Sequence, residues 1–426
     1  MKFFDRDYSV PEGFFPLDNA SIIYPPTEAK YNTQVFRMSI DLNIPIDRVV
    51  LHEALMDLLE RMPYFKVRLR EGFFWYYLSP NKKTPTIFDD DVRPCTRISK
   101  QKELKNFLFR VCAGENRIAI DFYHCLTDGG GGQTFLLSLF VRYLELKKYE
   151  IKEVPGIIRC NEKIQPWETK DQFQSYFDRN LPPPDFVKKA YHYKGILADR
   201  AYFTSGSIEI EDIKRISRHF GYTITEFLAA LLIKVFLETE GKEKKPVQIS
   251  IPISLRKLTG KNTMRNFSMF VIVSINPRLG EYTFKEILSL VSLQIKLQTE
   301  KHEIKRFISR NVSGERNFVV KSVPNFLKKP FFKIVSDVLG ETQYTTTISN
   351  IGLVNLPDEV SSLIERYDFF LTPNQKNPVS MAVSGINGKL FVNFSSYLKS
   401  DTLVEKKFFK YLVNWGVKVK IHSNRR

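Results

Sequence analysis

The period of the hydrophobic pattern changes repeatedly along this chain, and the change occurs in both halves. Residues 34–42, QVFRMSIDL, alternate between apolar and polar side chains, as a strand with one buried face does. Residues 49–62 then place apolar side chains at helical spacing, and Pro63 ends the predicted helix. In the second half, residues 246–256 alternate like a strand and residues 283–298 return to helical spacing. This alternation of strands and helices predicts an α/β chain.

Hairpin signals show that the predicted sheets are not purely parallel. Residues 64–78 resemble two strands joined by a turn, and residues 378–397 resemble a second pair. The second pair has Asn387-Gly388 at its tip, the dipeptide that best fits a type I′ hairpin turn. A hairpin makes its two strands antiparallel. We therefore expect an α/β fold whose sheets mix parallel and antiparallel strands, as in α+β proteins.

The length of the chain predicts two halves. A chain of 426 residues exceeds what a single hydrophobic core usually holds. Periodicity fades over residues 150–200, where prolines that cannot continue a helix recur at positions 155, 166 and 182–184. We therefore predict an N-terminal half at residues 1–165, a crossover at residues 166–200, and a C-terminal half at residues 201–426.

The net charge of +17 predicts a surface that attracts anions. Nucleic acid, anionic lipid, phosphorylated cofactors and an acidic carrier protein all fit such a charge. No nucleic-acid-binding motif accompanies the scattered basic groups, so we expect no nucleic-acid partner. An ordinary solvated surface explains the charge better than any one specific partner does.

Composition also predicts the compartment. We find no apolar run as long as a membrane span, and Asp5 and Asp7 interrupt the N-terminal aromatics where a signal peptide would be apolar. The cysteines show no CxxC spacing that would indicate a zinc or redox site; they are Cys95, Cys112, Cys125 and Cys160. We therefore expect reduced thiols, a cytoplasmic location and no metal.

Residues 122–133, FYHCLTDGGGGQ, carry the strongest functional signal. His124 ends a predicted strand, Asp128 follows four residues later, and four glycines precede a predicted helix at residues 133–146. Functional side chains often lie at such corners. The alternative is a buried histidine, satisfied by the backbone, beside a flexible turn. Cys125 adjoins the histidine, but neighbours on an extended segment point to opposite faces, so we expect a packing role for it.

The HCLTDGGGG segment resembles the HxxxDG signature of the chloramphenicol-acetyltransferase-like acyltransferase superfamily. That superfamily includes plant acyltransferases, nonribosomal peptide condensation domains, polyketide-associated acyltransferases and alcohol acetyltransferases. Four further segments are similar to segments of these enzymes in the same order, at residues 51–70, 249–258, 265–270 and 347–352. The resemblance covers most of the chain and implies two halves that enclose a central tunnel.

Two departures decide which branch the chain resembles most. Condensation domains usually carry a second histidine before the motif, where this chain has Tyr123. Plant members carry a late DFGWG motif, which is not found here. The chain is therefore most similar to the alcohol-acetyltransferase branch, near the condensation domains.

The resemblance implies a role for each residue of the motif. Imidazole titrates near neutrality and is the usual general base for activating a hydroxyl, and His124 is the only histidine within a recognisable motif. In relatives the aspartate points away from this histidine and pairs with an arginine, which makes Arg256 the expected partner of Asp128. Gly129 is expected to permit a close backbone approach where the helix begins, and the other glycines to leave room for a pantetheine arm.

The TISNIG segment supplies candidates for the oxyanion that acyl transfer generates. Ser349 is the first candidate donor and Asn350 the second, while a turn-forming Ser-Asn pair is the structural alternative. Asn266 is expected to bond neighbouring backbone and not the substrate.

These observations predict an acyl-coenzyme-A-dependent O-acyltransferase that acts on a small alcohol or, less readily, an amine. The alternatives are an enzyme that takes its acyl group from an acyl-carrier protein, and a non-catalytic relative that kept the fold. We expect acyl-coenzyme A as co-substrate and no bound cofactor. A chain that holds both halves of the site needs no neighbour to complete it, so we expect a monomer.

Overall fold

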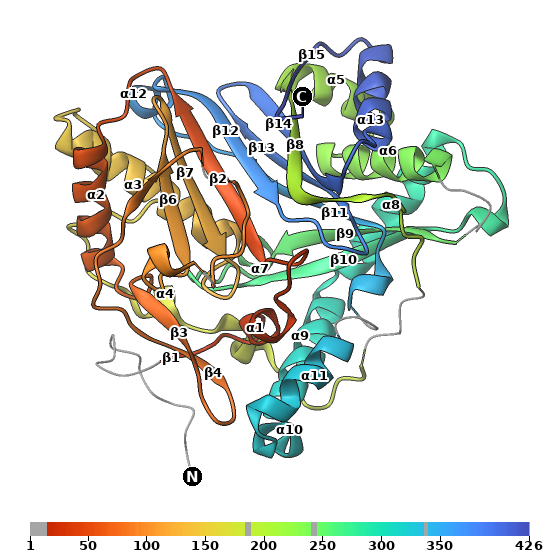
Figure 1. Cartoon of the computed structure of the whole chain (residues 1–426). Coiled ribbons are helices and arrows are strands. Elements are labelled where there is room, and N and C mark those ends of the chain that lie inside the picture. The colour runs from red at the N-terminus through yellow and green to blue at the C-terminus, as the bar shows by residue number, and fades with distance from the viewer. Residues whose placement is uncertain are drawn as a thin grey trace.

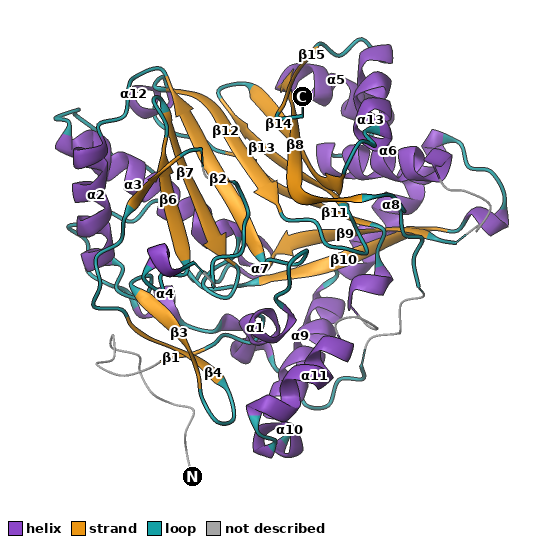
Figure 2. Ribbon diagram, in the orientation of Figure 1, coloured by secondary structure: helices purple, strands orange, loops and turns teal. Residues whose placement is uncertain are grey.

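The computed structural model describes residues 15–91, 93–99, 101–183, 189–239, 245–335 and 340–425 (Figure 1). Two large sheets face each other and diverge toward the top of the view, with helices on their outer sides (Figure 2). Parallel and antiparallel pairs occur in both sheets, so the predicted mixed α/β class is confirmed.

The first large sheet has five strands in the order β12-β2-β7-β6-β5. These are β12 (Ile364–Leu371), β2 (Val35–Leu42), β7 (Arg117–Tyr123), β6 (Phe109–Ala113) and β5 (Ile87–Asp89). Helices α2 (Arg48–Arg61) and α3 (Gly129–Leu146) cover its outer face. A small sheet, β1-β4-β3, lies below it and comprises β1 (Phe15–Pro16), β4 (Tyr76–Pro80) and β3 (Val67–Glu71).

The second large sheet has seven strands in the order β10-β9-β11-β13-β14-β8-β15. These are β10 (Ser268–Ile275), β9 (Val247–Ser254), β11 (Thr346–Leu353), β13 (Val379–Ile386), β14 (Lys389–Leu398), β8 (Leu197–Glu209) and β15 (Val419–Ser423). Its helices include α5 (Ile210–Phe220), α6 (Ile224–Thr239), α8 (Phe284–Gln298) and α13 (Leu403–Asn414). Shorter or peripheral helices are α1 (Tyr24–Thr27), α4 (Pro166–Thr169), α7 (Leu255–Thr259), α9 (Lys301–Arg316), α10 (Phe318–Ser322), α11 (Asn325–Val335) and α12 (Asp358–Ser361).

Strand β12 comes late in the chain but lies in the sheet formed by early residues. It pairs antiparallel with β2, with Phe369 opposite Met38. Ile364, Tyr367 and Phe369 are buried in the same core as α2 and α3. This exchanged strand ties the two large sheets together, because β12 also contacts β13 and β14. The predicted segment boundaries at 1–165, 166–200 and 201–426 stay a prediction.

Local signals in the sequence account for several helix and hairpin ends. The Thr223–Glu226 and Thr283–Glu286 runs have the sequence spacing of a capping box, and both boxes form. Thr223 Oγ1 accepts from the Glu226 amide at 3.3 Å, and Thr283 Oγ1 accepts from the Glu286 amide at 3.3 Å. From the sequence we expect Gly241 to end the first of these helices, and that position lies outside the described residues. At the hairpin tip, Asn387 and Gly388 have φ values of 49° and 74°, as a type I′ turn requires.

Two predicted boundaries differ from the structure near the histidine motif. Helix α3 begins at Gly129 and not at Gln133, because Asp128 caps it and tertiary contacts offset the poor helix propensity of glycine. Strand β9 ends at Ser254, so Arg256 lies in the short helix α7 and not at the end of the strand.

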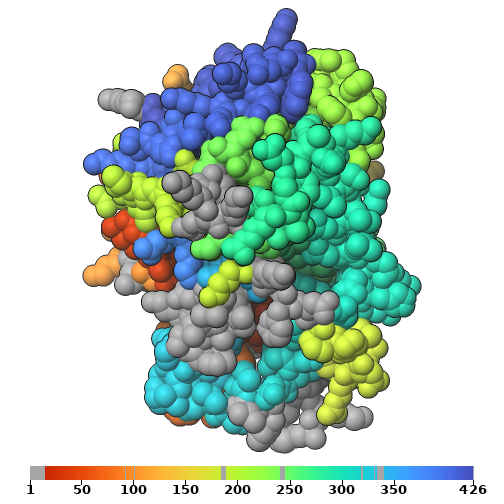
Figure 3. All heavy atoms as spheres, turned by 90° about the vertical axis from the view of Figure 1, so that its right-hand side faces the viewer, coloured from red at the N-terminus to blue at the C-terminus, as the bar shows by residue number. Residues whose placement is uncertain are grey.

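The crossover segment packs against α9. The Gln174 side chain donates to Glu315 at 2.9 Å and accepts from Arg316 at 2.9 Å, and the Asp178 amide donates to Ser309 at 2.9 Å. On the face shown in Figure 3, the yellow residues of this segment lie beside the cyan residues of the α9 region. Within the described ranges no single helix has the length and apolar character of a membrane span; α5 and α6 satisfy both criteria only as a pair bent by 80°.

Candidate active site

His124 lies where β7 ends, with its ring enclosed by aromatic side chains. Its amide donates to the Gln34 carbonyl at 2.8 Å and so continues the pairing of β7 with β2. The Tyr24 ring stacks on the imidazole with centroids 4.5 Å apart, and the Phe36 ring meets it edge-on at 5.3 Å. The imidazole remains partly exposed. These rings leave the histidine few orientations and keep most water away from it.

Asn266 fixes the tautomer of this histidine. Its amide nitrogen lies within 3.2 Å of the Asp18 carboxylate, the Ser21 hydroxyl and the His124 carbonyl, all of which can accept. The Asn266 oxygen therefore faces His124 Nδ1, at 2.9 Å, and Nδ1 must carry the proton. Nε2 has no hydrogen-bond partner among the described residues, so its lone pair is available to a substrate.

The surroundings of His124 favour the neutral ring. Burial lowers the pKa of His124 below its ordinary value. The negative charge of Asp128 and the hydrogen bonds to the histidine's own carbonyl and to Asn266 raise the pKa, but they offset only part of the effect of burial. A neutral imidazole with a free Nε2 is the form that accepts a proton.

Asp128 joins three segments of the chain and does not bond the His124 ring. Its Oδ2 accepts from Arg256 Nη1 and from the Phe267 amide, both at 2.8 Å, and its Oδ1 accepts from the Gly131 amide at 3.1 Å. Burial alone would raise the pKa of Asp128, but the charge of Arg256 and these hydrogen bonds outweigh burial and lower it. The carboxylate is therefore ionised at neutral pH and holds α3 against the α7–β10 segment.

The four glycines of the motif differ in how much room a side chain would have. The space is smallest at Gly131 and Gly132 and not at Gly129. A methyl group at Gly129 would lie 3.4 Å from Ile351, an ordinary contact, and one at Gly130 would lie 3.0 Å from Arg256. At Gly131 it would lie 2.5 Å from the Met264 carbonyl, and at Gly132 it would lie 2.9 Å from Phe36. The close backbone approach expected at Gly129 thus occurs at Gly131, and Gly131 and Gly132 face protein atoms instead of leaving room for a pantetheine arm.

Strand β11 brings Ser349 to the face that looks toward the first sheet. Ile348 packs in the core beneath α6 and α8, so Ser349 points the other way. Ala382, its partner on β13, packs in the core of the first sheet, which confirms the direction. Ser349 is 8% exposed, and Ile351, two residues on, reaches Gly129. Ser349 therefore lies on the surface that faces the start of α3.

Asn350 points away from this surface. Its amide nitrogen donates to the Thr225 hydroxyl of α6 at 2.9 Å, and its oxygen accepts from the Gly352 amide at 2.8 Å. Both ends of the side chain are thus engaged in holding the strand to α6. Of the two predicted oxyanion donors, the structure leaves Ser349 available.

Cys125 is fully buried, and burial raises the pKa of its thiol well above the usual value. A protonated, inaccessible thiol is a packing residue and not a nucleophile. Among the described residues, no group of three or more His, Cys, Asp or Glu side chains is placed to hold a metal ion.

Sequence reasoning missed the side chains that hold the histidine. Asn266 was expected to bond neighbouring backbone, but it reaches the ring and carbonyl of a residue 142 positions away. Tyr24, Asp18 and Ser21 were not singled out, because they precede the motif by about a hundred residues and belong to no recognisable pattern. The only available signal was the resemblance of the RNFSMF segment to the enzymes named above.

Comparison with known proteins identifies the architecture. No family model and no curated protein matches the sequence. Among solved structures, polyketide synthase associated protein 5 from Mycobacterium tuberculosis has a TM-score of 0.60 and 14% identity, over 93% of this chain and 98% of its own. TRI101 from F. graminearum, complexed with coenzyme A and T-2 mycotoxin, has a TM-score of 0.59 and 10% identity, over 95% and 99%. The epimerization domain from the third module of tyrocidine synthetase B has the same TM-score and identity, over 95% and 96%.

The chain has the two-lobed chloramphenicol-acetyltransferase-like fold. The match spans nearly the whole length of all three structures, so this fold includes both large sheets of the present chain. At 10–14% identity the likeness shows the fold alone, and the chemistry must be argued from the residues of this chain.

Replacing Gly131 by alanine tests the tight approach at the start of α3. Because the added methyl group meets the Met264 carbonyl and the Thr127 hydroxyl, Gly131→Ala is expected to lower the free energy of unfolding by about 1–3 kcal/mol. Gly314→Ala is the matched control, since that exposed helical glycine has open space around its Cα and alanine favours helix. Chemical denaturation of the two variants should give opposite signs, and equal stability of Gly131→Ala and the parent would contradict the close contact.

Proposed function

We propose that this protein is an acyltransferase that moves an acyl group from coenzyme A to a hydroxyl, or less readily an amine, with His124 as general base. The observation that carries the proposal is the fixed tautomer: Asn266 holds Nδ1 as a donor and leaves Nε2 without a partner among the described residues. A structural histidine has no need of an oriented, neutral ring with one free nitrogen. The coenzyme A complexes of TRI101, which share the fold, support coenzyme A as the donor.

Only one of the two ring nitrogens, Nε2, exchanges a proton in the proposed reaction. As the acceptor oxygen attacks the thioester carbonyl, its proton passes to His124 Nε2, while Nδ1 stays bonded to Asn266. The C–O bond forms and the carbonyl oxygen gains negative charge. Collapse of this tetrahedral intermediate breaks the C–S bond, and the leaving sulfur takes the proton back from Nε2. The products are an ester and free coenzyme A, and the ring returns to its starting state.

Ser349 is the proposed donor to the oxyanion. Its hydroxyl lies on the β11 face that looks toward the start of α3, while Asn350 is engaged with α6. A hydroxyl on a central strand is rigidly held, and donors that need no reorganisation are the ones that stabilise a developing charge. Asp128 and Arg256 act at a distance, because they position the segments on which the base and Asn266 lie.

An acyl-carrier protein is the second candidate donor. The likeness to the epimerization domain of tyrocidine synthetase B and the net charge of +17 favour it, since carrier proteins are acidic. Tyr123 favours coenzyme A instead, because it stands where condensation domains usually have a second histidine. The monomeric state and the cytoplasmic location stay predictions.

Thiol release from acyl-coenzyme A tests the proposal. With acetyl-coenzyme A and longer acyl donors against a panel of alcohols and amines, the wild type should release thiol, and His124→Ala should lower kcat by about 10²–10⁴-fold because the base is lost. His302→Ala, which removes an exposed histidine of α9, should change the rate by less than twofold. Equal rates for wild type and His124→Ala would reject the base. Transfer from an acyl-carrier protein but not from coenzyme A would select the second donor, and no transfer from either would indicate a non-catalytic relative.

Replacing Ser349 by alanine tests the oxyanion donor. Because the hydroxyl is needed only as charge develops, Ser349→Ala should lower kcat by about 10²-fold and change KM little. Ser400→Ala, at an exposed position beyond β14, is the matched control and should behave like the wild type. A rise in KM with unchanged kcat would assign Ser349 to substrate binding and remove it from the oxyanion site.

The pH dependence of kcat/KM reports the state of the base. The neutral imidazole is the active form, so activity falls as pH drops through the pKa of His124. Because burial lowers that pKa, the acid limb should lie below 6.5, the ordinary value for histidine. Steady-state rates measured from pH 4.5 to about 9 would show this limb. A midpoint at or above 6.5 would contradict the environment described for the ring.

A further inference from the structure

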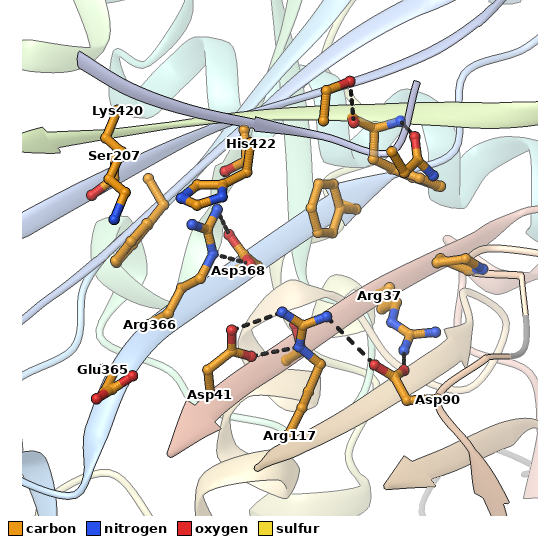
Figure 4. Close-up of a pocket in the computed structure, with 18 of the residues that line it drawn as sticks. Arg37, Asp41, Asp90, Arg117, Ser207, Glu365, Arg366, Asp368, Lys420 and His422 are labelled. Carbon is orange, nitrogen blue, oxygen red and sulfur yellow. Dashed lines mark hydrogen bonds and ion pairs between the residues drawn. The ribbon is translucent and has the colours of Figure 1, made fainter. Parts of the chain in front are cut away.

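A charged cleft of about 970 Å³ lies between the two large sheets (Figure 4). It lies on the face of the five-stranded sheet opposite to the His124 ring. Phe36 of β2 contacts that ring, whereas its neighbour Arg37 lines the cleft, and successive residues of a strand point to opposite faces. None of the side chains that hold the histidine lines this cleft.

The wall formed by the first sheet is lined by arginines and carboxylates that pair with each other. Arg117 bonds Asp41 with Nη2 2.7 Å from Oδ2, and Arg37 bonds Asp90. Asp41 and Asp90 are therefore neutralised by cations of the same wall. Glu365 and Asp91 also lie on this wall, so pairing reduces its negative charge but does not remove it.

The wall formed by the second sheet carries basic side chains without partners among the described residues. Lys420 and His422 project from β15 on the same face as Ser207 and Ser205 of β8, their partners in register. Neither Lys420 nor His422 has an ion-pair or hydrogen-bond partner within the part of the chain that the structure describes. Lys389 at the start of β14 lines the same cleft, also without such a partner. The Ser205 hydroxyl donates to Asn393 and accepts from Arg366, so this wall offers a ligand positive charge and the hydroxyl of Ser207.

Arg366 connects the two walls. Strand β12 places it beneath His422 in Figure 4, where its guanidinium bonds Asp368 at 2.9 Å and also the Ser205 hydroxyl of the opposite wall. The same guanidinium lies 4.9 Å from the centre of the Phe391 ring. Because Asp368 balances its charge, Arg366 adds little net potential to the cleft, and its bonds hold β12 against Ser205 of the second wall.

We propose that this cleft binds the phosphate groups of a small phosphate ester or diphosphate. Seven Arg and Lys side chains line it against five carboxylates, and three of those carboxylates are already paired with arginine. Lys420, Lys389 and the Ser207 hydroxyl lie together on the second wall, and they supply what a multiply charged oxyanion requires: point charges from lysine and a hydrogen bond from a hydroxyl group. Glu365 and Asp91 are the remaining acidic groups of the lining, on the opposite wall.

The site does not depend on acyl transfer, and two sources of phosphate fit it. One is coenzyme A, whose nucleotide part carries phosphate esters. The other is a separate phosphorylated metabolite that binds while substrates occupy the His124 side. The chemistry of recognition is the same for both, so the experiment must separate them.

Titration calorimetry with inorganic pyrophosphate tests the cleft directly. The full-length wild type is expected to bind the probe saturably at low salt, and the double variant Lys420→Ala/His422→Ala should raise Kd by about tenfold or more, because the lysine charge and the imidazole contact are lost. The control is Lys418→Ala/His302→Ala, which removes the same residue types from exposed positions outside the cleft. It should change Kd by less than about twofold. Thermal unfolding confirms that both variants are folded.

The outcomes separate the possible interpretations. Absence of saturable binding to the wild type, or equal loss of affinity in both double variants, would overturn the proposal and assign any attraction to net charge. If adenosine 3′,5′-diphosphate displaces pyrophosphate and the cleft variant raises KM for acetyl-coenzyme A, the phosphate belongs to the acyl donor. If pyrophosphate binds without changing the affinity for coenzyme A, the ligand is a separate metabolite. His124→Ala should bind pyrophosphate normally, so a failure of the acyltransferase proposal leaves this test unaffected.

Discussion

The buried carboxylate of Asp128 is the interaction on which the arrangement of this molecule depends. It accepts hydrogen bonds from Arg256 of α7, from the backbone of Phe267 before β10, and from Gly131 in the first turn of α3. One side chain thus caps a helix of the first lobe and binds two segments of the second. A buried carboxylate without partners is strongly unfavourable, so these three segments must assemble together or not at all. The lowered pKa of Asp128 shows that the partners more than offset the effect of burial.

The same carboxylate reaches the proposed base through the backbone. Phe267 is bound to Asp128, and the preceding residue, Asn266, holds both the carbonyl and the Nδ1 of His124. Asp128 of the first lobe therefore positions Phe267 and Asn266 of the second lobe, and Asn266 in turn positions the His124 imidazole of the first lobe. An aspartate that never touches the histidine ring still determines where that ring lies. In a serine-protease triad the aspartate would bond the imidazole itself, and here an amide takes that place.

The sequence predicted the parts of this site that are local and missed those that are not. Alternation and helical spacing predicted β2 and α2 close to their observed bounds, because one buried face imposes its period on the residues. The HxxxDG resemblance supplied the pairing of Asp128 with Arg256, which spacing alone does not contain. The contact of Asn266 with His124 joins residues 142 positions apart, and an asparagine has no local signature of such a role. Strand β12 was missed for a similar reason: IERYDFFL carries no mark of the sheet that it joins.

Strand β2 separates two different surfaces, and its register keeps them separate. Phe36 and Met38 face α3 and surround the histidine motif, while Arg37 and Asp41 face the charged cleft. Because side chains alternate along a strand, a slip of one residue would place arginine beside the imidazole and phenylalanine in the cleft. Pairing with β7 on one side and with β12 on the other prevents that slip. The exchanged strand β12 therefore does more than join the lobes: with Asp368 and Arg366 it completes the polar face, and with Phe369 it completes the apolar one, so both surfaces depend on the same register.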